Sequence, residues 1–136
     1  MADDSRFFDL EIITPDRVFW SGKASMLEMN TTEGKVGIYK KHIPMTMIIA
    51  PGVLTITEED GTKKKAALLK GFVEVTETTM SILAEVAEWP EDINVERAKK
   101  AEERARKRLE TKSADIDIAR AELALKRALV RKGLKA

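Results

Sequence analysis

The chain has 136 residues, of which 43% are hydrophobic, 35% charged and 5% aromatic, and its formal net charge is +1. It contains no cysteine and one histidine, His42, which excludes disulfides and cysteine metal sites and argues against multi-histidine zinc sites and catalytic triads. No apolar stretch is long enough to cross a bilayer, and the acidic start lacks the basic region of a signal peptide. We therefore expect the mature chain to begin here, in the reducing environment of the cytosol.

The charges divide the chain into two parts. Residues 1–92 carry 10 basic and 16 acidic side chains, a net charge of −6, whereas residues 93–136 carry 14 and 7, a net charge of +7. The small total charge therefore conceals an acidic body with a basic tail.

The first part has the alternating pattern of half-buried β-strands. Apolar residues recur at every second position in residues 8–12, 54–57 and 80–84. Turn signals occur at short intervals, at Thr14-Pro15-Asp16, Ser21-Gly22, Glu33-Gly34, Pro51-Gly52 and Asp60-Gly61. Asp60-Gly61 is the strongest because both residues tolerate the positive φ of a tight hairpin turn. The pattern predicts eight to ten short antiparallel strands that form a β-sandwich or flattened barrel, with residues 1–88 as its domain.

The pattern after Pro90 is helical. Apolar residues recur on one stripe from Val95 to Leu109, and Asp92 or Asn94 is suited to cap the start of this helix. The second helix is expected to begin near Ser113, which can cap it.

The two helices are expected to form an antiparallel hairpin, which makes residues 89–136 a second domain. Only about four residues, Glu110 to Ser113, separate them, and Gly133 is the expected end of the second helix. The apolar stripes are mostly alanine, so their contact buries little area and supplies only about a few kcal/mol at ~25 cal/mol/Å².

Local charge pairs should make each helix stable by itself. Four acid-before-base pairs at i,i+4 are expected to contribute about 0.2–0.5 kcal/mol each; they are Glu96–Lys100, Glu102–Arg106, Glu103–Lys107 and Glu122–Lys126. We therefore expect a hairpin that can open without loss of helix.

The order and spacing of several segments resemble the epsilon subunit of bacterial rotary (F-type) ATP synthases. These segments are Leu10-Glu11-Ile12-Ile13-Thr14-Pro15, Gly34-Lys35-Val36-Gly37-Ile38 before His42-Ile43-Pro44, Gly71-Phe72-Val73-Glu74-Val75, Ile82-Leu83-Ala84-Glu85, and residues 115–128. The resemblance implies a non-catalytic subunit at the cytoplasmic face of the cell membrane, bound to it only through the complex. It implies that the β-sandwich joins the gamma subunit to the c-ring, with the apolar strands of residues 26–50 as our candidate contacts. It also implies a tail that extends toward the alpha and beta subunits and blocks ATP hydrolysis.

Some members of this family bind ATP on the hairpin through an Ile-Asp-x-x-Arg-Ala motif. Here the matching segment is Ile93-Asn94-Val95-Glu96-Arg97-Ala98, in which Asn94 replaces the aspartate. The residues that the resemblance implies as nucleotide contacts are Glu88, Ile93, Asn94, Arg97, Ala98, Arg104, Arg127 and Arg131. No cofactor is required, and ATP is implied as a regulatory ligand.

The arginines of this set lie at spacings that suit an anion. Arg97 and Arg104 are seven residues apart on the first helix, and Arg127 and Arg131 are four apart on the second, so they could hold an anion from both sides. Asn94 can still cap the helix but lacks the charge of aspartate. We expect this to weaken ATP binding by about 1–3 kcal/mol.

Three other interpretations use the same residues. The arginines could form an ordinary solvated helix face. The basic hairpin could bind nucleic acid, but acidic residues are interleaved on the first helix and no aromatic residue follows Trp89. The β-sandwich could bind a small molecule by itself, which would need a concave apolar pocket. The sequence has no glycine-rich phosphate loop and no evident catalytic pair of carboxylates, so an enzyme active site is not expected.

Overall fold

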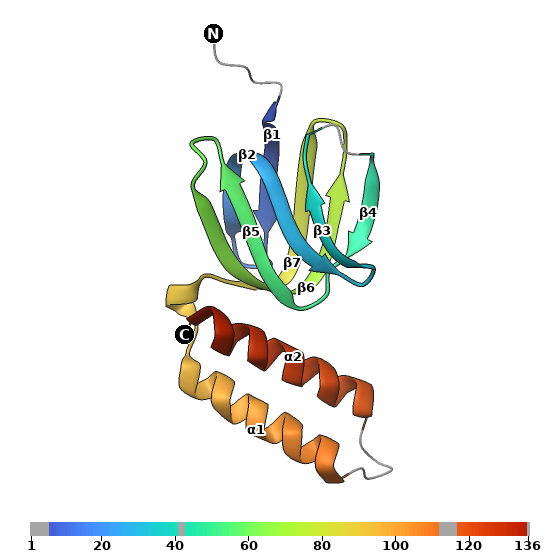
Figure 1. Ribbon diagram of the computed structural model, residues 1–136, viewed down its shortest axis with the longest axis vertical. Helices are drawn as coiled ribbons and strands as arrows, with labels where there is room; N and C mark the ends of the chain where they lie inside the picture. Colours follow the sequence, from blue (N-terminus) through green and yellow to red (C-terminus); the bar gives the residue numbers. More distant parts are fainter. Residues whose placement is uncertain (1–5, 41–42, 112–116, 136) are drawn as a thin grey trace.

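The computed structural model describes residues 6–40, 43–111 and 117–135. A β-domain comes first and a pair of helices follows, which confirms the predicted order (Figure 1). In chain order the elements are β1 (Phe8–Ile13), β2 (Val18–Thr31), β3 (Gly34–Ile38), β4 (Met45–Ile48), β5 (Gly52–Glu58), β6 (Lys63–Val75), β7 (Thr79–Glu88), the 3-10 helix η2 (Pro90–Asp92), α1 (Val95–Thr111) and α2 (Ile118–Lys135).

The strands are fewer and longer than predicted. Within the described ranges there are seven, instead of eight to ten short ones, because β2 has 14 residues and β6 has 13. The first half of β2 pairs with β1, and its second half pairs with β3 and β5. Likewise β6 pairs first with β5 and then with β4 and β7. Each long strand therefore takes the place of two short strands.

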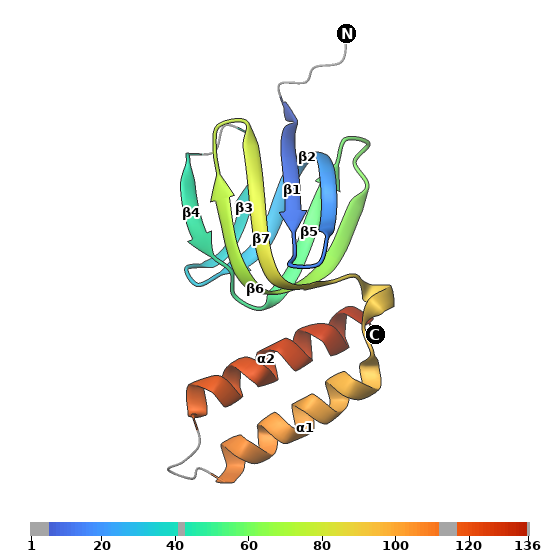
Figure 2. The same ribbon diagram turned by 180° about the vertical axis from the view of Figure 1, so that it is seen from behind.

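The strands close into a flattened barrel. They follow the order β1-β7-β6-β5-β2, and β2 pairs with β1 to complete the ring, while β3 extends from β2 and β4 from β6. Among the strands of the described ranges, all pairs are antiparallel except β1 and β7, which are parallel (Figure 2). The expectation of antiparallel strands alone is therefore wrong at this pair. β1 and β7 are the first and last strands of the domain and are not joined by a hairpin turn, so they can run in the same direction.

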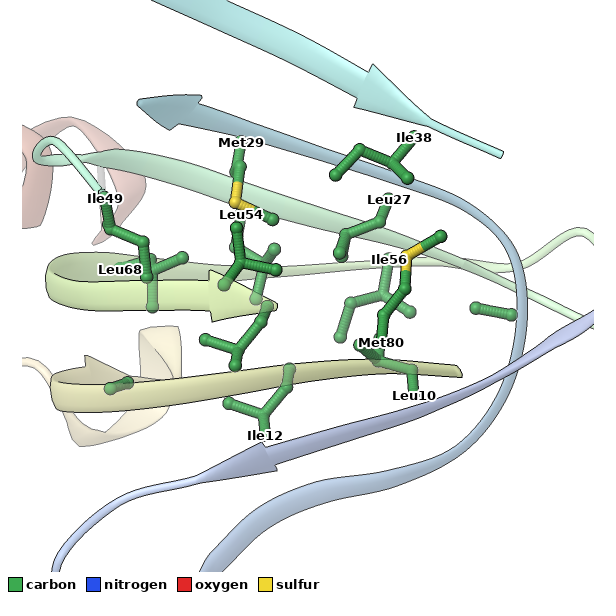
Figure 3. Close-up of a cluster of buried hydrophobic side chains, with 14 of the residues drawn as sticks. Leu10, Ile12, Leu27, Met29, Ile38, Ile49, Leu54, Ile56, Leu68 and Met80 are labelled. Atoms are coloured by element: carbon green, nitrogen blue, oxygen red, sulfur yellow. The ribbon is translucent and has the colours of Figure 1, made fainter. Parts of the chain in front are cut away.

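The core fills the space inside the barrel (Figure 3). On β1 the buried residues are Phe8, Leu10 and Ile12, and the residues between them are exposed, which confirms the predicted alternation. Other fully buried side chains from every part of the ring are Leu27, Met29, Leu54, Ile56, Leu68, Met80 and Ile82. One continuous apolar core therefore holds the β-domain together.

A glycine allows β6 to bend across the end of the barrel. The pairing of β6 with β7 shifts at Lys70 and Gly71, and Gly71 has a φ of 141°. A Cβ at this position would lie 2.2 Å from the carbonyl oxygen of Leu83. Only glycine combines this positive φ with so close an approach of the neighbouring backbone.

The structure corrects two expectations about the helix ends. Asn94 caps α1 as predicted, since its Oδ1 accepts a hydrogen bond of 3.1 Å from the backbone N–H of Arg97. The cap of α2 is Asp117, which accepts from the N–H of Arg120 at 3.0 Å; the expected cap, Ser113, lies outside the described residues. Gly133 does not end α2, which continues to Lys135, because one glycine costs a helix only about 1 kcal/mol.

The two helices lie side by side beneath the β-domain, with α2 between the barrel and α1 (Figure 1). Two alanines of each helix, seven residues apart, are buried, which confirms the alanine seam; they are Ala98, Ala105, Ala121 and Ala128. Of the four predicted i,i+4 pairs, the described residues form Glu102–Arg106, at 2.9 Å. None of the helices in the described ranges has the length and apolar composition to span a membrane.

Candidate anion-binding site on the helical hairpin

A pocket opens where the end of the β-domain meets the hairpin. Its volume is about 270 Å³, and its lining comes from β7, η2, α1 and α2 together with Asn94. The lining residues are Glu88, Asp92, Asn94, Arg97, Ala98, Lys100, Ala101, Arg104 and Arg131. Four of them are basic and two are acidic, so the pocket favours an anion.

The structure brings most of the predicted contact residues together. Six of them line the pocket: Glu88, Asn94, Arg97, Ala98, Arg104 and Arg131. Ile93 does not, because its side chain is buried against Ala67 and Leu69 of β6. Arg127 is also outside the lining, and its buried Nε has no hydrogen-bond partner among the described residues.

Three lining residues were not predicted. Lys100 and Ala101 lie one helical turn from both Arg97 and Arg104. The helical spacing that places the two arginines on one face therefore also places Lys100 and Ala101 on that face. Asp92 belongs to η2 and reaches the pocket only through the tertiary fold.

The four basic residues of the pocket differ in their partners. Arg131 on α2 donates from Nε to Oε1 of Glu88 at 2.5 Å, and both side chains are about 30% exposed. In the described part of the chain, the guanidinium groups of Arg97 and Arg104 have no ion-pair partner. The α1 side of the pocket therefore offers unpaired positive charge, whereas the α2 side is already occupied by the carboxylate of Glu88.

A second charged cluster links the two helices near this pocket. Glu102 on α1 accepts a hydrogen bond from Lys132 Nζ on α2 at 3.0 Å, and its other oxygen accepts from Arg106 Nε at 3.0 Å. Lys132 and then Arg106 hold the pKa of Glu102 below its usual value, because both bonds favour the carboxylate. The contact between Glu102 and Lys132 ties the helices together beyond what the alanine seam provides.

This cluster predicts an acid-sensitive hairpin. The pKa of Glu102 is lower in the folded chain than in the unfolded chain. The ionised carboxylate of Glu102 therefore stabilises the folded chain at pH values above its pKa in the unfolded chain. The contribution is lost as the pH falls through the folded value. We expect Glu102→Gln to lower stability at neutral pH and to reduce the loss of stability between about pH 6 and about pH 3. Urea unfolding at several pH values measures this.

The neighbouring Glu103 provides the control. It is exposed and has no ion pair within the described residues, so Glu103→Gln should keep the acid sensitivity of the wild type. Equal acid sensitivity of Glu102→Gln and the wild type would show that the cluster contributes nothing.

Together, the flattened β-barrel and the helical hairpin define a small two-part β-then-α protein with a positively charged pocket between its parts. The family model described as "ATP synthase, Delta/Epsilon chain, beta-sandwich domain" matches residues 7–90. The model of the long alpha-helix domain of the same chain matches residues 91–131. The chain therefore belongs to the delta/epsilon chain family of ATP synthase subunits.

Known proteins match most of the length of this chain. An ATP synthase epsilon chain of Caldanaerobacter subterraneus subsp. tengcongensis is 43% identical over 124 residues, which are 91% of this chain and 90% of the relative. The epsilon chain of Symbiobacterium thermophilum is 44% identical over 132 residues, or 96% and 91% of the two chains. A chain in the structure of the Euglena gracilis mitochondrial ATP synthase (OSCP/F1/c-ring) is 24% identical with a TM-score of 0.82. The matched region covers 94% of this chain and 81% of the Euglena chain, and the two chains have the same fold.

Proposed function

We propose that this chain works as the non-catalytic epsilon subunit of an ATP synthase central stalk, associated with the membrane only through the complex. In this proposal the β-domain binds the gamma subunit and the c-ring, and the hairpin moves toward the alpha and beta subunits to inhibit ATP hydrolysis. The observation that carries it is the combination of a barrel that has its own core with a hairpin that packs on it through a separate, smaller apolar cluster. The names of the relatives support the same function.

An exposed apolar row supplies a surface for a stalk partner. In this row, which we call the apolar row, neighbouring strands of the barrel place five residues in register on the outer face: Ile48, Phe72, Leu83, Ile13 and Val18. Four of them are exposed large hydrophobic side chains and Ile13 is half-buried. Contiguous apolar surface of this kind is typical of binding sites. The segment 26–50, expected to make contact, contributes Ile48 to this row and also exposes Tyr39, Ile43 and Met45.

The centre of the apolar row should be essential for stalk binding. We expect Phe72→Asp to weaken binding to a gamma–c-ring complex about 10- to 150-fold, because burial of a phenylalanine contributes about 1.5–3 kcal/mol. Titration calorimetry with a complex that lacks this subunit measures the change. Thr78→Asp adds the same charge to an exposed turn between β6 and β7 and should bind like the wild type. Equal affinity of both variants would exclude the apolar row as the contact surface.

The pocket is proposed to bind ATP as a regulatory ligand. Arg97, Lys100 and Arg104 lie along one face of α1 and would hold the phosphates, as charge-assisted hydrogen bonds are the strongest available. Arg131 would join them once its contact with Glu88 is exchanged for a phosphate oxygen. ATP would then favour the closed hairpin, since it would contact residues of α1 and α2 at the same time.

The replacement of aspartate by Asn94 should set the affinity of this site. We expect Asn94→Asp to tighten ATP binding about 5- to 150-fold, because a carboxylate keeps the cap of α1 and adds a charged acceptor worth about 1–3 kcal/mol. Titration with ATP, followed by the resonances of Arg97 and Arg131, measures it. Asn94→Ser keeps a capping oxygen without the charge and should show no gain. Absence of a response to millimolar ATP in both the wild type and Asn94→Asp would eliminate the site.

A further inference from the structure

The segment that joins the barrel to the hairpin is fixed to the barrel at its first residue. The ring of Trp89 stacks on Phe19 of β2, with ring centroids 4.3 Å apart and planes 11° apart. Phe19 is itself part of the main core, with only 6% of its surface exposed. Stacked aromatic pairs contribute beyond their buried area, so Trp89 belongs to the β-domain.

The residues after Trp89 form a short rigid unit. Within η2 the backbone N–H of Asp92 donates to the carbonyl of Trp89 at 3.0 Å, and that of Ile93 donates to the carbonyl of Pro90 at 3.2 Å. Arg17 connects this unit to the barrel, since its guanidinium lies 5.7 Å from the centroid of the Phe19 ring and 3.9 Å from a carboxylate oxygen of Asp92.

The segment is fixed again at its last residue. Ile93 is 5% exposed and packs with Ala67 and Leu69 of β6, while Val130 and Leu134 of α2 cover this cluster. The barrel and the joining segment therefore form one side of this cluster, and α2 forms the other side. Polar contacts accompany it, since Lys135 Nζ donates to the carbonyl of Pro90 at 2.9 Å, but such exposed contacts contribute little.

Asn94 is the first residue beyond these anchors, and α1 begins directly after it. We propose that residues 89–93 form a strap that stays with the barrel, that α2 separates from it at the contact of Ile93 with Val130 and Leu134, and that the hairpin pivots between Ile93 and Asn94. This inference rests on the proposed movement of the hairpin. It makes Asn94, α1 and α2 the moving part and leaves the anchored strap with the barrel.

Tryptophan fluorescence can test the strap directly. The chain has two tryptophans, so Trp20→Phe leaves Trp89 as the single reporter. In this background, Val130→Asp together with Leu134→Asp places two carboxylates in the apolar cluster and should release α2. We expect the emission wavelength of Trp89 and its protection from acrylamide to stay at their values in the Trp20→Phe parent. The chain unfolded in guanidinium chloride gives the values for an exposed Trp89.

Release of α2 is measured in the same chains with spin labels. Because the chain has no cysteine, Glu77→Cys in the turn before β7 and Glu122→Cys on α2 provide unique sites, both exposed. The proposal predicts that the distance between these labels increases in the double aspartate variant while Trp89 stays protected.

Two results would overturn the strap. One is that Trp89 becomes exposed as the labels separate, which would place the pivot before Trp89. The other is that the labels do not separate, because the cluster would then not hold α2. If instead the hairpin does not inhibit ATP hydrolysis, its removal would leave the rate of hydrolysis unchanged. The fluorescence result on the strap would still be valid.

Discussion

A chain that ends at Ile93 is expected to assemble into the ATP synthase and to lose its inhibition of ATP hydrolysis. The barrel has its own closed ring of strands and its own core, so it should fold without the helices. The stalk contact proposed on the apolar row also lies outside the hairpin. The rate of ATP hydrolysis by enzyme reconstituted with the full chain or with the shortened chain measures the effect, and we expect a several-fold increase with the shortened chain.

Equal incorporation of both chains, measured in the purified enzyme, is the control for this comparison. If the two enzymes hydrolyse ATP at the same rate with equal incorporation, the hairpin is not an inhibitor. If the shortened chain fails to assemble, the proposal that the barrel alone binds the stalk is wrong.

The largest effect on stability is expected at Gly71. In Gly71→Ala the new Cβ would meet the backbone of Leu83 at 2.2 Å, and the residue would have to keep a φ of 141°. Backbone cannot move aside as a flexible side chain can, so we expect a loss of about 3 kcal/mol or more in the free energy of unfolding. Guanidinium chloride unfolding monitored by circular dichroism measures it.

Gly133 provides the matched control for this substitution. It lies inside α2, and no atom lies within 4 Å of a Cβ added there. Gly133→Ala should therefore stabilise the chain by about 0.5–1 kcal/mol through helix propensity and a less flexible unfolded state. Similar effects of the two substitutions would contradict the role assigned to the backbone contact at Gly71.

Local patterns in the sequence predicted the kinds of elements better than their lengths. Ser21-Gly22 has the composition of a turn but lies inside β2, where pairing with β1 continues through both residues. A Cβ on Gly22 would be 3.1 Å from the ring of Trp20, so this glycine makes room for an indole rather than for a turn. Such a tertiary reason leaves no local signal, and the strand was therefore expected to be shorter.

Asp60-Gly61 shows the reverse case, in which composition identified the turn. β5 ends at Glu58 and β6 begins at Lys63, and Gly61 has the expected positive φ, 87°. The side chain of Asp60 accepts a hydrogen bond from the N–H of Thr62 at 2.9 Å. The connection is the tight hairpin turn expected, since the N–H of Glu58 donates to the carbonyl of Thr62 at 2.8 Å across its base.

The candidate site was predicted in part for similar reasons. Helical spacing relates Arg97 to Arg104, and both line the pocket. Spacing does not reveal how α2 is rotated about its axis, which decides that Arg131 reaches the pocket and Arg127 does not. It also cannot reveal the pairing of Glu102 with Lys132, because these residues are distant in the sequence and meet only when the hairpin closes.

The distance between the β-domain and α2 in the assembled enzyme tests the central claim most directly. Spin labels at Glu77→Cys and Glu122→Cys, measured by pulsed electron paramagnetic resonance with and without ATP, report this distance. A barrel that stays in place while the hairpin moves predicts two distances, with the shorter one matching the isolated chain and gaining population when ATP is added. A single distance, the same in the free chain and in the enzyme and unaffected by nucleotide, would contradict the claim.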